Sequence, residues 1–235
     1  MTNRPSAIRQ FAVLFVKDLR QESHTRDMLT SMGLYSLLVL VIFGAALSQS
    51  TIKSNIIQIS GGLVWAMLVF TSLLGLNRSF AAEKEDAGLD GILLIPLDRS
   101  VIYLAKTASN LVFLLIVEVL ACPLFYFFFL ADYPLTTSLW LVVPPLFFVS
   151  LGIAGVGTLL ATITSGTRGK DVLLAILFIP VIFPLLFAVV SATSVAVMGS
   201  EQLLSVYVPA LALAAGYDVI MISLSWLLYG FVVTN

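Results

Sequence analysis

Residues 77–106 read NRSFAAEKEDAGLDGILLIPLDRSVIYLAK, and this stretch decides how the chain folds. It is the longest polar interruption in an otherwise apolar sequence. It holds five of the 13 acidic residues and four of the 12 basic residues of the chain. Because it separates the second and third long apolar runs, it fixes where one long element ends and the next begins.

The stretch has a helical pattern of its own. Residues 80–87 show amphipathic spacing, and Gly88 is placed to stop a helix. Residues 89–95 form a second short apolar piece, which ends at Pro96 because proline cannot continue a helix with a full ladder of hydrogen bonds. Asp98 stands where the long helix that follows needs an N-cap. The pattern predicts two short helical pieces followed by a capped helix.

The composition places the chain in a membrane. Of its 235 residues, 60% are hydrophobic and 11% are charged, whereas soluble domains have about 45–50% apolar residues. A soluble core of this length cannot absorb so much apolar surface, so the sequence predicts an all-α polytopic membrane protein. We expect one membrane domain over residues 1–235. The net charge of −1 and the lack of a basic run argue against nucleic-acid binding.

Six apolar runs are long enough to span a bilayer as helices, at a rise of about 1.5 Å per residue. The predicted spans are residues 32–50, 59–76, 103–130, 138–164, 171–198 and 208–233.

The basic residues indicate the orientation of these spans. Eleven of the 12 lysine and arginine residues precede the first span or fall in the connections between spans 2 and 3 and between spans 4 and 5. Lys53 is the exception. By the positive-inside rule, this side and both chain ends are cytoplasmic. Residues 77–106 are then cytoplasmic too, and two interpretations stay open for them: a segment that receives a partner, or a solvated loop without one.

Residues 1–31 precede the first span. Ile8, Phe11, Ala12, Phe15 and Leu19 share one helical face, and the charged residues 9, 17, 18 and 20 lie mostly away from it. This pattern predicts a helix lying flat on the membrane surface.

Two acidic residues fall inside predicted spans. Glu118 lies near the middle of span 3, and Asp218 lies in span 6. An ionised carboxylate at membrane depth costs several kcal/mol, so such a residue faces the bundle interior or is protonated. Glu118 either lines a pathway or forms a hydrogen bond to a neighbouring helix as a structural group, and both interpretations stay open.

Prolines and glycines mark spans 4 and 5. Pro144 and Pro145 in span 4 and Pro180 and Pro184 in span 5 predict bends. Gly152, Gly155 and Gly157 favour close packing of helices.

The sequence contains no motif that indicates catalysis or cofactor binding. Residues 166–171 lack the spacing of a phosphate-binding loop, and no nucleophile–base pair is visible. His24 is the single histidine, and Cys122 is the single cysteine, so a metal site within this chain is not expected. The chain is expected not to be an enzyme.

Four groups of residues together match the pattern of a known family. They are residues 17–20 (KDLR) with Glu22 and Arg26; Trp65 with residues 72–78 (SLLGLNR); residues 88–100 (GLDGILLIPLDRS) with Tyr103 and Lys106; and residues 168–170 (RGK) with residues 173–180 (LLAILFIP) and Pro184. In these residues, and over nearly its whole length, the chain resembles the haem exporter protein B family, CcmB. The third group is the most specific part of the resemblance.

The resemblance implies a permease with the fold of a type-2 ABC exporter, in the bacterial inner membrane, serving cytochrome c maturation. Its implied partners are a cytoplasmic ABC ATPase, a haem-handling membrane subunit, a small accessory membrane protein and a second permease copy. Haem would be a substrate, and ATP would be hydrolysed by the partner. The resemblance makes residues 77–102 the coupling segment, with contact through Glu83, Glu85, Asp86, Asp90, Pro96, Asp98 and Arg99.

Two other functions remain open at this point. The chain could be a force-transmitting or assembly subunit of the same complex without a substrate path of its own. It could also be a secondary transporter that needs no ATPase, which predicts paired charges within the membrane or inverted repeats.

Overall fold

The computed structural model of the chain describes residues 6–48, 56–85, 98–131, 139–167, 169–198 and 205–232. Within these residues all regular structure is helical. The helices are α1 (Ala7–Thr25), α2 (Asp27–Ser48), α3 (Ile56–Glu85), α5 (Arg99–Phe129), the short 3-10 helix η2 (Leu139–Leu141), α6 (Val143–Thr164), α7 (Lys170–Met198) and α8 (Tyr207–Val232).

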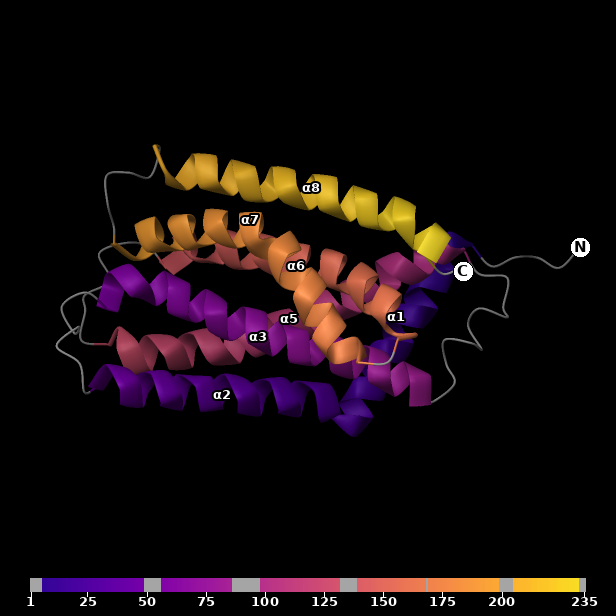
Figure 1. Cartoon of the computed structure of the whole chain (residues 1–235), viewed down its shortest axis with the longest axis horizontal. Coiled ribbons are helices and arrows are strands. Elements are labelled where there is room, and N and C mark those ends of the chain that lie inside the picture. The colour runs from indigo at the N-terminus through magenta and orange to yellow at the C-terminus, as the bar shows by residue number, and fades with distance from the viewer. Residues whose placement is uncertain are drawn as a thin grey trace, which may run out of the picture.

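Six of these helices, α2, α3, α5, α6, α7 and α8, are long and apolar enough to cross a membrane. They coincide with the six predicted spans, so the prediction of an all-α polytopic membrane protein is confirmed. The long helices lie side by side in a bundle, and α1 crosses one end of it (Figure 1).

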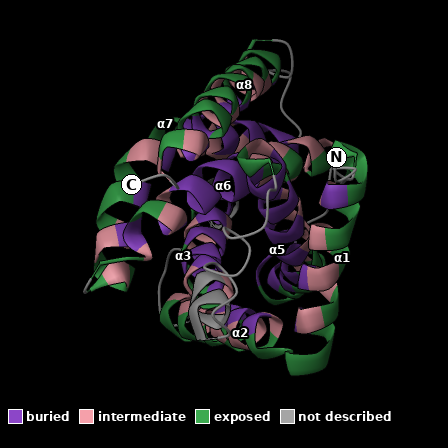
Figure 2. Cartoon of the chain, turned by 90° about the vertical axis from the view of Figure 1, so that its right-hand side faces the viewer, coloured by how far each residue is buried: buried purple, intermediate pink, exposed green. Residues whose placement is uncertain are grey.

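Helix α6 is the centre of the bundle. It packs against α3, α5, α7 and α8, and Figure 2 shows its mostly buried surface among the surrounding helices. Three glycines bring these neighbours close. A Cβ atom at Gly152 would collide with Leu185 of α7, one at Gly155 would meet α8, and one at Gly157 would collide with Leu76 of α3. Small residues at these positions let helix backbones approach each other in a membrane.

Helix α3 is longer than the sequence suggested. The short helical piece predicted to begin at residue 80 is not separate, because α3 runs without a break to Glu85. Residues 81–85 (AAEKE) are strong helix formers and nothing before them breaks a helix, so the helix continues beyond the apolar run. The predicted stop at Gly88 and the second short piece lie outside the described residues.

The start of α5 follows the sequence prediction. Asp98 is the N-cap, and its Oδ1 accepts a hydrogen bond of 3.1 Å from the backbone N–H of Ser100. This bond satisfies one of the N–H groups that have no partner within the helix.

The prolines act differently from one another. Pro144 and Pro145 do not bend span 4 as expected, because they stand in the first turn of α6, where backbone N–H groups need no partner within the helix. Pro180 and Pro184 lie inside α7, and Figure 1 shows α7 changing direction along its length. Pro123 also lies inside a helix, α5.

The turn between α1 and α2 is tight and well bonded. Arg26 has a positive φ of 56° and ends α1, and α2 begins at the next residue. The side chain of Glu22 accepts a hydrogen bond of 2.8 Å from the backbone N–H of Leu29. This bond, together with the bond from the backbone N–H of Arg26 to the carbonyl oxygen of Glu22, holds α1 at an angle to the bundle.

Candidate functional site

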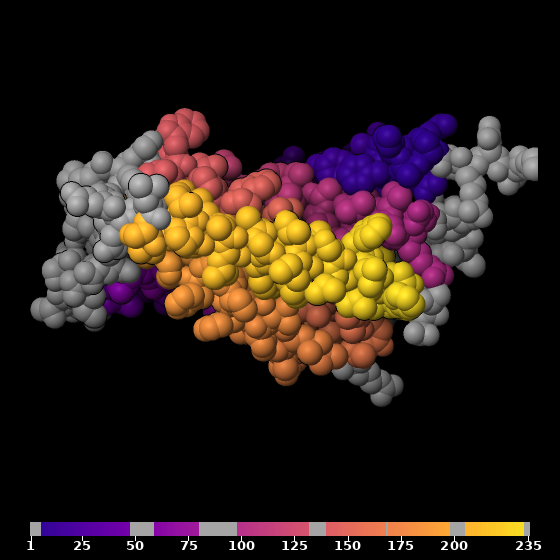
Figure 3. Space-filling model, turned by 90° about the horizontal axis from the view of Figure 1, so that it is seen from above, coloured from indigo at the N-terminus to yellow at the C-terminus, as the bar shows by residue number. Residues whose placement is uncertain are grey.

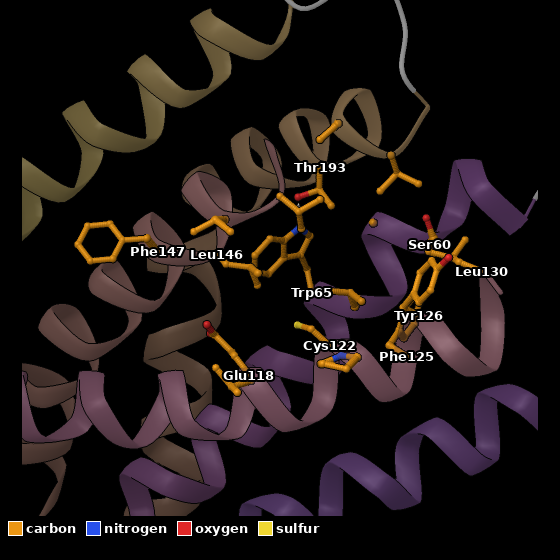
Figure 4. A pocket seen from close by; sticks show the side chains of 18 of the residues that line it. Ser60, Trp65, Glu118, Cys122, Phe125, Tyr126, Leu130, Leu146, Phe147 and Thr193 are labelled. Atoms are coloured by element: carbon orange, nitrogen blue, oxygen red, sulfur yellow. Dashed lines mark hydrogen bonds between the residues drawn. The ribbon is translucent and has the colours of Figure 1, made fainter. Parts of the chain in front are cut away.

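A cavity of about 570 Å³ lies in the half of the bundle opposite α1. The beginnings of α3 and α6 and the ends of α5 and α7 form its walls. The walls are mainly apolar, and a few polar side chains reach them: Ser60, Trp65, Glu118, Cys122, Tyr126 and Thr193. Figure 4 shows these side chains gathered from α3, α5 and α7.

Glu118 is the acidic residue of the cavity. Its side chain is buried, and Oε1 accepts a hydrogen bond from the hydroxyl of Ser150 on α6. The next residue, Val119, also lines the cavity and is 71% exposed, so the cavity reaches the outer surface of the bundle. This arrangement suits a mainly apolar molecule that carries a polar group. Glu118 therefore has a feature of each interpretation. It forms a hydrogen bond to a neighbouring helix, and it also lines a cavity.

Trp65 closes the inner wall of the cavity. Its indole Nε1 donates a hydrogen bond of 3.1 Å to the hydroxyl of Thr193 on α7, and its ring is almost completely buried. The bond joins α3 to α7 beside the cavity. No signal in the sequence linked these two residues, because they are 128 positions apart in runs that are apolar on all sides.

Asp218 does not line the cavity. It is buried where α8 meets α6, close to Gly152, and neither carboxyl oxygen has a hydrogen-bond partner among the described residues. The structure therefore does not bring Glu118 and Asp218 into one site. Among the residues described, no group of three or more His, Cys, Asp and Glu side chains is arranged to hold a metal ion.

At the opposite end of the bundle, three helices meet at the start of α5. The backbone N–H of Asp98 donates to the side-chain oxygen of Gln10 on α1 at 3.3 Å. Arg99 Nη1 donates to the carbonyl oxygen of Gly230 near the end of α8, also at 3.3 Å. Of the other expected contact residues, Glu83 and Glu85 lie in the last turn of α3. Asp86, Asp90 and Pro96 fall outside the described part of the chain.

A buried ion pair strengthens this junction. Lys106 Nζ of α5 lies 3.1 Å from Asp18 Oδ2 of α1, and the side chains are 9% and 7% exposed. Asp18 also contacts Lys17, whose side chain is 40% exposed, at 3.4 Å. The sequence placed Asp18 away from the apolar face of its helix. In the structure this polar side of α1, with Gln10, Asp18 and Glu22, is the side that packs against the bundle.

Comparison with known proteins assigns the family. The profile of the CcmB protein family matches residues 9–228. The chain is 28% identical to the heme exporter protein B of Pseudomonas aeruginosa over 75% of this chain and 77% of the relative. It is 30% identical to the protein of that name from Escherichia coli K12 over 70% and 72%. The match to the heme exporter protein B of Rhodobacter capsulatus, at 30% identity, covers 55% of this chain and 58% of the relative. The match of the family profile to nearly the whole chain, together with the six-span bundle, means that this protein belongs to the CcmB family.

Proposed function

We propose that this chain is, over residues 1–235, the membrane permease subunit of an ABC transporter complex for cytochrome c maturation. It would couple a partner ATPase to haem export or to the release of a haem chaperone. The observation that carries this proposal is the family match over residues 9–228, supported by relatives named heme exporter protein B. The expected partners are a cytoplasmic ATPase, a haem-handling membrane subunit, a small accessory membrane protein and a second copy of this chain.

The arrangement of α3 and α5 supports coupling at a distance. The end of α3 and the start of α5 both lie at the end of the bundle that carries α1 (Figure 1), and residues 86–97 join them in the sequence. The far portions of the same helices supply Trp65 and Glu118 to the cavity. At about 1.5 Å per residue, each of these side chains lies about 30 Å along its helix from the connection. A push on the connection would tilt both helices and change the shape of the cavity.

The contacts at the start of α5 would spread such a movement. Asp98, Arg99 and Lys106 join α5 to α1 and to the end of α8. A displacement of α5 therefore shifts α1 and α8 with it or breaks these bonds. This link suits a subunit that receives force from a cytoplasmic partner.

The orientation of the chain is part of the proposal. The described basic residues of α1, of the end of α3 and of the starts of α5 and α7 gather at the end of the bundle crossed by α1. The positive-inside rule makes this end cytoplasmic. The cavity then lies in the outer half of the bacterial inner membrane.

The second candidate is a force-transmitting subunit without a substrate path. The cavity lined by Glu118 favours a path in this chain instead, because a purely mechanical subunit has no need for a carboxyl group on the wall of an accessible cavity. A secondary transporter would be expected to pair its charges within the membrane. Among the described residues neither Glu118 nor Asp218 forms an ion pair, so the arrangement favours the ATPase-coupled function.

A double substitution tests the coupling. Asp90→Ala together with Arg99→Ala should abolish capture of the ABC ATPase by the tagged chain in detergent-solubilised membranes. Arg99→Ala alone controls for the loss of the contact with Gly230. Unchanged capture of the ATPase by the double variant would refute the assignment of residues 77–102 as the coupling segment.

A further inference from the structure

Helix α1 turns its acidic side chains toward the bundle and both of its arginines outward. The carboxylates of Asp18 and Glu22 are buried, the first against Lys106 and the second at the turn into α2. Arg9 and Arg20 are exposed. The outward surface of α1 is thus positive, because both carboxylates lie on the opposite side of the helix.

The angular positions of these residues around the axis of α1 show which way the outward surface faces. Gln10, Leu14, Asp18 and Glu22 recur every four residues and form the side that packs against the bundle. With 3.6 residues per turn, the apolar face that contains Ile8 lies about a quarter of a turn from this side. Arg9 and Arg20 lie about half a turn from Asp18.

If the apolar face of α1 rests on the membrane, as the sequence pattern predicts, the two arginines lie at the level of lipid headgroups. With the bundle on one side and the apolar face toward the membrane, the side with Arg9 and Arg20 points along the membrane surface, away from the bundle. Val13 and Val16 lie between them and are 62% and 58% exposed. The two arginines are eleven residues apart, about 16 Å along the helix. Figure 3 shows α1, in indigo, at the surface beside the beginning of α5.

We propose that the outer face of α1, formed by Arg9, Val13, Val16 and Arg20, binds the headgroups of anionic phospholipids. The guanidinium group makes paired hydrogen bonds to phosphate, and the valines suit the boundary between headgroups and acyl chains. The attachment of α1 to a six-span bundle keeps this face beside a lipid leaflet. This binding site is independent of the proposed transport function.

Photolabelling of the full chain tests the site. The chain is placed in phosphatidylcholine nanodiscs that contain a minor share of phosphatidylglycerol with a photoreactive headgroup, and labelled peptides are mapped. We expect label on residues 7–25. Each basic residue beside an anionic surface strengthens binding about five-fold, so Arg9→Gln with Arg20→Gln should reduce labelling about 25-fold. Higher salt should reduce labelling of the unaltered chain, because it screens exposed charges.

Arg78→Gln with Lys170→Gln is the matched control, since it removes two positive charges from the same end of the bundle but none from α1. This variant should keep the label on α1. The proposal is overturned if α1 of the unaltered chain takes no label, if labelling is insensitive to salt, or if both double variants lose it equally. The first of these outcomes would mean that something other than anionic lipid covers this face.

Discussion

At the scale of single residues, the hydrogen bond between Ser150 and Glu118 decides how a carboxyl group is accommodated within the bundle. The bond fixes Glu118 on the wall of the cavity and ties α5 to α6. Because the cavity is otherwise mainly apolar, we propose that this carboxyl group interacts with a transported molecule.

We predict that Glu118→Gln separates the two roles of this residue. The amide oxygen can still accept the bond from Ser150, so the variant should fold and accumulate normally. It cannot ionise, so production of mature cytochrome c in cells that depend on the variant should fall at least several-fold. Ser150→Ala is the control, because it leaves the buried Glu118 carboxyl group without this donor, at a cost of about 1–3 kcal/mol, and keeps the carboxyl group. Normal cytochrome c levels with Glu118→Gln would show that the carboxyl group is only structural.

The sequence could identify Glu118 but not its surroundings. A charged residue in an apolar run is conspicuous in a sequence. Its partner Ser150, and the bond between Trp65 and Thr193, depend on how each helix is rotated about its axis. The spanning helices are apolar on all sides, so no amphipathic pattern specifies that rotation.

At the scale of helices, α1 is held to the bundle by polar contacts. We predict that Asp18→Asn or Lys106→Gln loosens α1, because removing one partner of a buried ion pair costs about 3–5 kcal/mol. Faster hydrogen exchange of α1 amides would measure the loss. Lys17→Gln should have little effect, since the Lys17 side chain is far more exposed than that of Lys106.

The exchanged pair, Asp18→Lys with Lys106→Asp, provides the decisive comparison. It keeps opposite charges on the two helices and should recover part of the lost protection. If the amides of α1 exchange as fast in the exchanged pair as in the single variants, the ion pair does not hold α1 in place.

The packing of α6 gives a second prediction at this scale. Gly157→Ala should destabilise the protein by about 1–3 kcal/mol, because the added methyl group has no room beside the buried Leu76. Leu76→Ala in the same chain should relieve this collision, so the two effects should not add. Thermal unfolding in detergent checks both. Gly62→Ala, where nothing lies within 4 Å, is the control and should be nearly neutral. Simple additivity would contradict the close contact between α3 and α6.

The helices also show where sequence reasoning succeeds and fails. All six spans were predictable, because bilayer thickness imposes a length that composition alone reveals. The cap at Asp98 was predictable from local chemistry. The continuation of α3 to Glu85 was missed, since the end of an apolar run marks the membrane boundary and not the end of a helix. The packing of the polar side of α1 was missed because its partner, Lys106, lies in a distant helix.

At the scale of the whole molecule, the beginning of α1 and the end of α8 lie at the same end of the bundle, joined through α5. We predict that this end is cytoplasmic. A fluorescent protein that folds only in the cytoplasm should therefore be bright when it is fused to either terminus. A fusion within residues 132–138 to an enzyme active only outside the cytoplasm should be active. The opposite pattern would invert the orientation and place the cavity in the inner half of the membrane.

The central claim is that this bundle works with a separate ATPase. The most direct measurement is affinity purification of the tagged chain from native membranes in mild detergent, with its partners identified by mass spectrometry. We expect recovery of an ABC ATPase together with a haem-handling membrane protein. Recovery of the chain alone, or only with further copies of itself, would argue against coupling to an ATPase and favour a transporter that works without one.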